Sequence, residues 1–325
     1  MRVLLAGATG TAGAEVLTTL LRDGHEVLAL TRTLPNATEP QPAARKLQWL
    51  SWAQLRSWAN EQEPPKIHEI PSIDAIISCL ASRSGGIKDS ETVEFDANKV
   101  LLDVAISAPI PQFVLLSAIC VQRPRLAFQQ QKRRFEDALS ASDLHWTIVR
   151  PTAFFKSLSG QIDRIKAGKS FLVFGNGQLT ACKPISQRDL ARYLVDCLSD
   201  PQRRRKVLPI GGPGPAITPL DQVEMLERAF QRNIKVRAIS PRLFDVAHWL
   251  FACFARYSQW CRDRAEFCRI GKFYATESML VWNTNTAQYD AALTPETGAD
   301  TLGDFYQAIA SGRASVPIKG EHSLF

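Results

Sequence analysis

The glycine-rich segment GATGTAG at residues 7–13 constrains this chain more than any other feature. It follows an apolar run, RVLLA, and precedes AEVLTTLLRDG, in which apolar residues recur at helical spacing until Gly24. The next segment, HEVLALTR, again has the pattern of a strand. This order of strand, turn, helix and strand predicts a βαβ unit with parallel strands and a right-handed crossover.

Glycines between a strand and a helix have a chemical use in such a unit. They permit a tight turn and let the backbone approach a pyrophosphate closely. The free N–H groups and the dipole at the start of the helix favour the phosphate charge. We therefore expect Gly7, Thr9, Gly10 and Gly13 to bind a dinucleotide.

Later apolar runs repeat the alternation of strand and helix. Strands are predicted at 75–81, 113–119 and 146–152, and helical patterns at 91–107 and 126–141 separate them. The alternation predicts an α/β fold, a doubly wound parallel Rossmann sheet with a smaller, mainly helical C-terminal substrate-binding portion.

The chain divides into two predicted parts. We place an NADP-binding Rossmann domain over 1–150 and the substrate-binding portion over 151–325, with some segments of the second part returning to the Rossmann core. Residues 208–218, LPIGGPGPAIT, have the pattern of a strand followed by a loop, and the remainder is mainly helical. The least regular region, 33–72, is predicted to form surface loops around a helix.

Composition narrows the class of protein. The longest apolar stretch, 243–254, contains Asp245 and His248 and is shorter than the roughly 20 residues that span a bilayer. Seven cysteines without a CxxC pair argue against a disulfide framework and offer no metal-binding spacing. The N-terminal run lacks the basic region and cleavage site of a signal peptide. The formal charge of +7 suits nucleic acid, an anionic membrane surface or an anionic small molecule, and charge alone does not choose.

The end of the second predicted strand indicates which dinucleotide is bound. An NAD-binding site usually has an acidic residue there for the ribose 2′-hydroxyl, whereas this chain has Leu30, Thr31, Arg32 and Thr33. A guanidinium can direct two donors at a 2′-phosphate and stack on adenine. Arg32 therefore favours NADPH, with a solvated arginine at a strand end as the alternative.

Small residues follow the next two strands at the edge where the nicotinamide is expected. Leu80, Ala81 and Ser82 lie in the stretch SCLASRSGG, and Ser117 ends FVLLS one strand along the chain. We assign the first three to the cofactor and Ser117 to catalysis. An ordinary loop between strand and helix is the alternative for the first three.

The helix predicted at 126–141 carries a lysine but not its usual partner. Short-chain dehydrogenases place a Tyr-xxx-Lys pair there, with tyrosine as proton donor, and this chain has Phe128 and Lys132 at that spacing. The missing phenol argues against ordinary alcohol or ketone chemistry but not against hydride delivery to a polarised carbon–carbon double bond. We predict that Lys132 is catalytic and binds the cofactor. A solvated lysine in the run QKRRFE is the alternative.

Longer segments closely resemble the NADPH-dependent divinyl chlorophyllide 8-vinyl reductases, atypical extended short-chain dehydrogenases that also have Phe at the position of Phe128. RPTAFFKSL followed by ACKPIS is the most specific part, whereas the glycine loop identifies only the superfamily. The resemblance covers nearly the whole chain, through SCLASRSGGIKDS, VLLSAICVQ, RPTAFFKSLSGQI, ACKPISQRDLARYLVDCL, LPIGGPGPAITPLDQ and GKFYATESMLV.

The resemblance implies that NADPH reduces the C8 vinyl group of a divinyl (proto)chlorophyllide to ethyl in (bacterio)chlorophyll synthesis. The substrate is then a flat, carboxylated magnesium tetrapyrrole, and no nucleic-acid partner is expected. Because the sequence shows no plastid transit peptide, we expect a bacterial, cytoplasmic enzyme, with peripheral association with the photosynthetic membrane because its pigment is apolar. The proton that completes the ethyl group can come from Lys132, from an ordered water or from a group near Cys182 and Lys183. The sequence has no signal for an oligomeric state.

Aromatic and basic residues after the strand at 146–152 are candidates for ligand contact. Phe154 and Phe155 can stack on nicotinamide or pigment, with core packing as an equal alternative. Lys156 and Lys183 can pair with a propionate or be solvated. We assign Pro151 and Phe154 to the cofactor, and Phe155, Lys156, Cys182 and Lys183 to the substrate.

Two other classes of protein share this scaffold. An NmrA-like regulator senses a dinucleotide without catalysis, and an assembly factor for photosynthetic or respiratory complexes merely retains the fold. Lys132 and the ACKPIS segment favour the enzyme, because a non-catalytic binder has no evident need for them. The amphipathic region 244–260 can dock on a membrane, shield a porphyrin or form helix core. His248 within it is a candidate ligand of the substrate magnesium, with ordinary packing as the commoner alternative.

Overall fold

The computed structural model describes residues 1–34, 46–58 and 72–316. The strands of its main sheet are β1 (Arg2–Ala6), β2 (Glu26–Thr31), β3 (Leu47–Ser51), β4 (Ala75–Ser78), β5 (Gln112–Leu116), β6 (His145–Pro151) and β8 (Lys206–Ile210). They lie in the order β3-β2-β1-β4-β5-β6-β8, and every neighbouring pair is parallel. The order reverses between β1 and β4, and ligands of such sheets bind beyond the carboxyl ends of the strands at that point.

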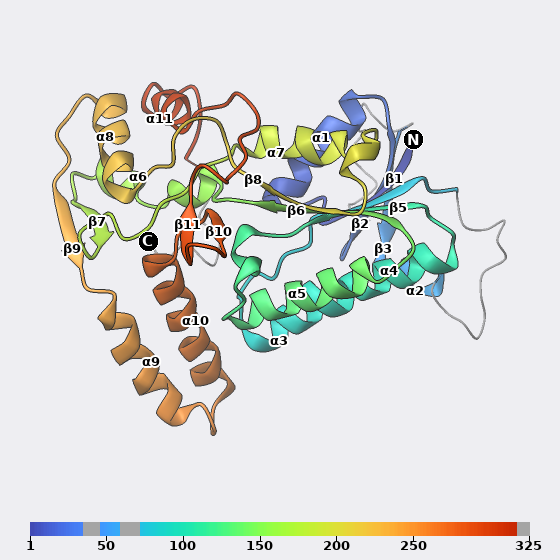
Figure 1. Ribbon diagram of the computed structural model, residues 1–325, viewed down its shortest axis with the longest axis horizontal. Coiled ribbons are helices and arrows are strands. Elements are labelled where there is room, and N and C mark those ends of the chain that lie inside the picture. Colours follow the sequence, from blue (N-terminus) through green and yellow to red (C-terminus); the bar gives the residue numbers. More distant parts are fainter. Residues whose placement is uncertain (35–45, 59–71, 317–325) are drawn as a thin grey trace.

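Helices cover both faces of this sheet, namely α1 (Thr11–Arg22), α2 (Trp52–Trp58), α3 (Ile87–Ser90), α4 (Ala97–Ser107), α5 (Ala127–Ser140) and α7 (Gln187–Asp196). Figure 1 shows α1 and α7 on one face, and α4 and α5 on the other. Successive residues of β1 point to opposite faces, so Leu5 joins the core under α1 while Leu4 joins the core under α4. Burial on both faces explains why the strands are continuous apolar runs in the sequence.

The C-terminal portion has a core of its own around the fully buried Tyr306. Its elements are α6 (Ile162–Lys166), β7 (Phe171–Phe174), α8 (Pro219–Phe230), β9 (Val236–Ile239), β10 (Val281–Asn283), β11 (Gln288–Asp290) and α11 (Leu302–Ala310). β7 pairs with β9 in parallel, and β10 pairs with β11 in antiparallel. Between these segments, α7 and β8 return the chain to the main sheet.

Two further helices, α9 (Arg242–Phe254) and α10 (Gln259–Thr276), form a hairpin that projects from the body of the molecule (Figure 1). α9 and the start of α10 occupy residues 244–260, the region that is amphipathic in the sequence. Among the residues that the structure describes, no helix is both long and apolar enough to cross a membrane.

The α/β fold and the parallel Rossmann sheet are confirmed, and so are the strands predicted at 75–81, 113–119 and 146–152. The prediction for 33–72 was wrong at 47–51, which is not a loop but the edge strand β3. An edge strand buries few side chains, and in β3 Leu50 alone is buried, so the sequence pattern is weak. The rest of that region, 35–45 and 59–71, lies outside the described residues.

Candidate active site

The turn after β1 has the shape that its glycines predict. Gly7 has a φ of +82°, and a Cβ placed there would lie 2.7 Å from the carbonyl oxygen of Cys79. A Cβ on Gly13 would lie 2.0 Å from the carbonyl oxygen of Gly7. Both positions therefore require glycine, while Thr9 and Gly10 remain exposed at the start of α1. The first N–H groups of a helix have no partner within the helix, so this exposed end fits a pyrophosphate.

Lys156 lies at the same place, which the sequence did not indicate. It follows β6 in a short 3-10 turn, Phe155–Leu158, and its Nζ lies 2.8 Å from Oγ1 of Thr11, the first residue of α1. We predicted that Lys156 binds the substrate. The structure instead positions its ammonium beside the phosphate-binding turn, because the chain turns back toward α1 after β6.

Arg32 is exposed directly after β2, on the same edge of the sheet as the glycine turn. The side chain of Thr31 donates a hydrogen bond to the carbonyl of Thr33, which tightens the turn around Arg32. The guanidinium is thus available at the edge where the 2′-phosphate of an adenosine ribose is expected.

A buried carboxylate holds Lys132 at the centre of the carboxyl edge. Nζ of Lys132, on α5, lies 2.7 Å from Oε2 of Glu94, whose side chain is only 2% exposed. The other oxygen of Glu94 accepts hydrogen bonds from the backbone N–H and the hydroxyl of Ser82, at 2.8 Å and 2.9 Å. Glu94 therefore joins α5 to the loop after β4, and Lys132 is not a freely solvated lysine.

The charge of Lys132 acts on two buried thiols, and this shows which strand ends its ammonium lies near. Burial raises the pKa of Cys79 to about 12 and that of Cys120 to about 11, and the positive charge of Lys132 acts in the opposite direction on both. Cys79 follows β4, and Cys120 lies in the turn after β5. Lys132 thus lies near the ends of both strands, where the nicotinamide half of a dinucleotide is expected. Both thiols stay protonated at neutral pH and are not nucleophiles.

A second buried carboxylate, Glu136, lies one turn further along α5. Its Oε1 accepts hydrogen bonds from Oγ of Ser117 at 2.6 Å and from Nε of Arg150 at 3.0 Å, and its Oε2 pairs with the same guanidinium. We predicted that Ser117 is catalytic. Its hydroxyl is buried and committed to Glu136, so the structure assigns it to fixing α5 on the ends of β5 and β6.

Sequence reasoning missed both glutamates. Glu94 lies in a π-helical turn, Glu91–Asp96, within the segment ETVEFDAN, which reads as a solvated helix. Four residues on, Asn98 is also buried, donates to the carbonyl of Glu94 and accepts from the hydroxyl of Ser78. Polar residues that recur at i and i+4 on the inner face of an otherwise apolar helix are the available signal.

The residues assigned to the substrate are mostly engaged elsewhere. Phe155 is 2% exposed and packs on Phe305, with ring centroids 5.5 Å apart. Lys183 is buried, and its Nζ lies 2.7 Å from Oε1 of Glu296. Burial raises the pKa of Cys182 to about 12. The structure therefore assigns Phe155 and Lys183 to packing rather than substrate contact, whereas Phe154 is only partly buried.

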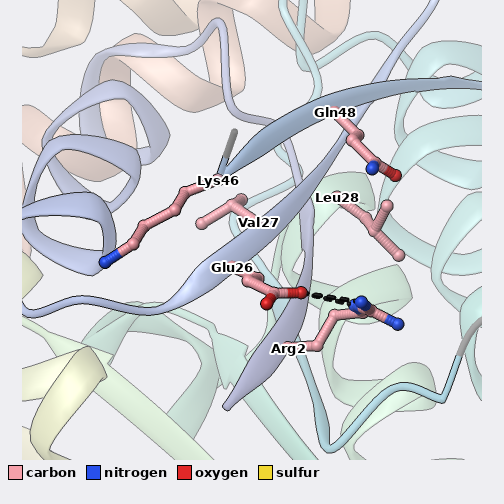
Figure 2. A pocket seen from close by; sticks show the side chains of 6 residues that line it. All are labelled: Arg2, Glu26, Val27, Leu28, Lys46 and Gln48. Atoms are coloured by element: carbon pink, nitrogen blue, oxygen red, sulfur yellow. Dashed lines mark hydrogen bonds and ion pairs between the residues drawn. The ribbon is translucent and has the colours of Figure 1, made fainter. Parts of the chain in front are cut away.

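Two cavities accompany this arrangement. Figure 2 shows the smaller one, at the amino ends of β1 and β2, where the ion pair of Arg2 and Glu26 lines a space of about 10 Å³. It lies at the opposite edge of the sheet from Lys132 and holds no more than a water molecule. The larger one, about 340 Å³, lies where α9 and α10 meet the start of α5. It is lined by Arg125, Leu126, Phe244, Asp245, His248, Cys268, Arg269, Lys272, Phe273, Thr276 and Glu277.

His248 has an ordinary packing role. Its Nδ1 lies 3.1 Å from the carbonyl oxygen of Ala265, across the α9–α10 hairpin. Among the described residues, no group of three or more His, Cys, Asp or Glu side chains is placed to hold a metal ion.

Solved structures share this fold at low sequence identity. A human epimerase family protein with NADPH has a TM-score of 0.65 and 16% identity, over 96% of this chain and 99% of that one. The UDP-glucuronic acid 4-epimerase of Bacillus cereus in complex with NAD has a TM-score of 0.61 and 15% identity, over 96% of this chain and 98% of that one. These similarities show the Rossmann-type fold.

Sequence comparisons are more specific. Residues 7–201 match the NAD(P)H-binding family. The divinyl chlorophyllide a 8-vinyl-reductase of Zea mays is 41% identical over 99% of this chain and 82% of its own length, and that of Arabidopsis thaliana is 38% identical over 95% and 76%. The photosystem II assembly factor Ycf39 of Synechocystis is 24% identical over 83% of this chain and 80% of its own.

Proposed function

Because the chain belongs to the family of divinyl chlorophyllide a 8-vinyl-reductases and has an NAD(P)H-binding domain, we propose that it uses NADPH to reduce the C8 vinyl group of a divinyl (proto)chlorophyllide a to ethyl. One observation in the structure carries the proposal. The ammonium of Lys132 is held by buried Glu94 at the carboxyl edge of the sheet, beside the expected nicotinamide site. A chain that only binds a dinucleotide does not need a buried ion pair at that position.

The cofactor-binding residues are assigned by their positions around the edge. Gly7 and Gly13 shape a turn that a Cβ would fill, so the backbone there can approach the diphosphate. Lys156, beside Thr11, neutralises its charge. Arg32 binds the 2′-phosphate and so favours NADPH over NADH. Leu80, Ala81, Pro151 and Phe154 surround the nicotinamide half, and Ser82 acts by holding Glu94.

Reduction of a vinyl group adds one hydride and one proton across the double bond. The bound NADPH supplies the hydride, and the negative charge that develops in the substrate spreads into the conjugated macrocycle. Lys132 holds a proton at Nζ, and Glu94 fixes this ammonium in place. We assign the proton that completes the ethyl group to Lys132 or to a water that it orders. The two alternatives near the C-terminal portion are disfavoured. The ammonium of Lys183 lies against Glu296 and the carbonyl of Thr294, within the C-terminal portion and not at the ends of β4 and β5, and burial raises the pKa of Cys182 to about 12.

The absence of a phenol beside Lys132 fits this chemistry. Phe128 occupies the position of the usual tyrosine and packs with Cys120, Leu126 and Phe273. A proton donor for a carbonyl oxygen is therefore missing, while a carbon–carbon double bond needs a proton only at carbon.

The proposal is tested by mixing purified protein with divinyl chlorophyllide a and either NADPH or NADH. The expected product is heavier by two hydrogens and forms with NADPH. Arg32→Ser should lower kcat/KM for NADPH by about tenfold or more, since a charge-assisted contact contributes about 1.5–3 kcal/mol. Arg237→Ser, an exposed arginine on β9, is the matched control and should have no effect. Binding of NADPH without any turnover would favour the assembly-factor alternative suggested by the Ycf39 similarity.

The location of the enzyme follows from its pigment. We propose peripheral association with a membrane, because a tetrapyrrole is flat and largely apolar. The exposed apolar side chains of α9 support it. A bacterial cytoplasmic enzyme stays a prediction of the sequence.

A further inference from the structure

Helix α9 presents an unusual surface, since none of its thirteen residues is buried. Large apolar side chains along α9, the following turn and the start of α10 are between 52% and 81% exposed. They are Leu243, Val246, Trp249, Leu250, Phe254, Tyr257 and Trp260. Scattered exposed apolar residues are normal in a folded protein, but a contiguous set on one projecting element marks an interaction site.

The hairpin is nevertheless a well-packed unit. Phe244 fits against Gly271, where a Cβ would lie 2.5 Å from its ring, and it also contacts Phe174 on β7. Lys272 pairs with Asp245 across the two helices at 2.6 Å. The exposed residues of α9 are therefore held on a fixed scaffold.

The tip of the hairpin, residues 254–264, combines aromatic rings with positive charges that have no carboxylate partner in the described part of the chain. Residues 241–276 contain six Arg or Lys side chains and three carboxylates. Within the described chain, no carboxylate lies within ion-pair distance of Arg256, Arg262 or Arg264, although Arg264 lies over the ring of Trp260 at 5.3 Å. Tryptophan and tyrosine favour the boundary between water and hydrocarbon, and arginine favours anionic headgroups.

The middle of α10 lies against the candidate active site. Oε1 of Glu266 accepts a hydrogen bond of 2.9 Å from the backbone N–H of Ala127, the first residue of α5. A Cβ on Gly85 would lie 2.7 Å from Cδ1 of Ile270, so α10 also packs on the loop that contains Ser82. These are the two segments that hold Lys132 and Glu94. α10 thus joins the exposed tip to the active site, and these contacts lie 7 to 11 residues, roughly 10–17 Å, beyond its first residue Gln259.

We propose that the α9–α10 hairpin docks on an anionic lipid bilayer, with the apolar side chains of α9 and its tip in the interface and Arg256, Arg262 and Arg264 against the headgroups. Charge argues for lipid rather than for a second copy of this chain, because a symmetric contact would bring the arginines of two tips together. The docked hairpin would hold the active site next to the layer that contains an apolar pigment. The docking surface deepens the peripheral association proposed above, and this last step alone rests on the proposed reaction.

The test measures co-sedimentation of the purified full chain with vesicles of phosphatidylcholine alone or with 30% phosphatidylglycerol. The intact protein should bind the anionic vesicles, and high salt should weaken binding. The triple variant Leu250→Ser, Phe254→Ser, Tyr257→Ser should reduce the partition coefficient by about tenfold or more. Arg256→Gln with Arg264→Gln should reduce it by a similar factor on anionic vesicles.

Two control variants change one exposed apolar residue and one exposed arginine outside the hairpin. Ile106→Ser on α4 and Arg237→Gln on β9 should leave vesicle binding unchanged. The proposal is overturned if the intact protein does not co-sediment with anionic vesicles, or if the hairpin variants bind these vesicles as well as the intact chain does. It is also overturned if sedimentation velocity shows a dimer that the triple variant converts to a monomer.

A turnover assay distinguishes failure of the docking surface from failure of the proposed reaction. Turnover of detergent-dispersed divinyl chlorophyllide with NADPH should be the same in the triple variant and the intact protein, because the tip lies away from Lys132. If vesicle binding depends on the hairpin but no turnover occurs with any variant, the docking surface stands and the proposed reaction falls.

Discussion

Two buried glutamates on the same side of the sheet have opposite uses. Glu94 and Glu136 are each about 2% exposed at the side chain, and each accepts a hydrogen bond from a serine and pairs with a largely buried cation. Oε2 of Glu136 also lies 3.8 Å from Nη1 of Arg133, which is more exposed than Arg150. Glu136 binds Arg150, a neighbour that is itself buried and fills both carboxylate oxygens. Glu94 instead binds Lys132, whose single ammonium lies at the carboxyl edge, near enough for its charge to act on the pKa of Cys79 and Cys120.

The choice of cation separates the two roles. A guanidinium is always charged and binds a carboxylate in a fixed geometry, so the Glu136–Arg150 pair serves as a rigid joint. An ammonium can give up a proton and has donors free for a ligand, so the Lys132–Glu94 pair is suited to chemistry. The comparison predicts that changes at the first pair affect folding, and that changes at the second affect turnover.

The largest effect is expected at Lys132. Lys132→Met keeps the length of the side chain but removes the proton donor, and general acid catalysis contributes about 10²–10⁴-fold. We therefore expect kcat/KM for divinyl chlorophyllide to fall by that factor. Lys99→Met, at a half-exposed lysine on α4, is the control. Near-normal turnover by Lys132→Met would remove this residue from the mechanism.

The next effect is on stability. Glu136→Ala leaves the guanidinium of Arg150 buried without its carboxylate, which costs about 3–5 kcal/mol in the free energy of unfolding. Urea titration followed by fluorescence measures it. Asp137→Ala is the control, because this adjacent carboxylate pairs with Arg133 at the surface and should cost about 1 kcal/mol or less. A loss as small as that of the control would contradict the assignment of Glu136 as a structural joint.

The smallest effect concerns pH and the thiols beside Lys132. Burial raises the pKa of Cys79 to about 12 from an ordinary 9.0, so the folded state keeps a proton that the unfolded state loses. The contribution of this thiol to the free energy of unfolding is fully present below pH 9 and is lost as the pH rises toward 12. When the pH is raised from 9 to 10.5, the free energy of unfolding of the intact protein should therefore fall by about 1–2 kcal/mol more than that of Cys79→Ala, as measured by urea titration at each pH. Cys253→Ala, at an exposed cysteine, should leave the pH dependence unchanged.

The sequence predicts the sheet and the dinucleotide turn better than it predicts the side-chain contacts of the site, and the reasons are physical. The sheet and the dinucleotide turn follow from local patterns, because apolar runs and glycine spacing involve neighbours in the chain. Lys132 was selected by its spacing from Phe128, and its catalytic role stays a prediction. Its partner Glu94 lies 38 residues away, and a glutamate is exposed in most helices, so its burial was not predictable. The contact of Lys156 with Thr11 was not predictable for a similar reason, since Thr11 lies 145 residues earlier.

The hairpin shows the opposite case. Residues 244–260 are amphipathic in the sequence, and that pattern fits a core helix as well as a surface helix. Only the packing decides, because α10 is buried against α5 and the loop after β4 while α9 is left outside.

The most direct test of the central claim is a double-mutant cycle on turnover. kcat/KM with NADPH and divinyl chlorophyllide would be measured for the intact protein, Lys132→Met, Glu94→Gln and the double variant, each checked for folding by thermal denaturation. If Glu94 acts by holding Lys132, Glu94→Gln alone costs about tenfold or more, and the double variant is no slower than Lys132→Met. If the two losses multiply in the double variant, Glu94 acts independently of Lys132 and the account of the site is wrong.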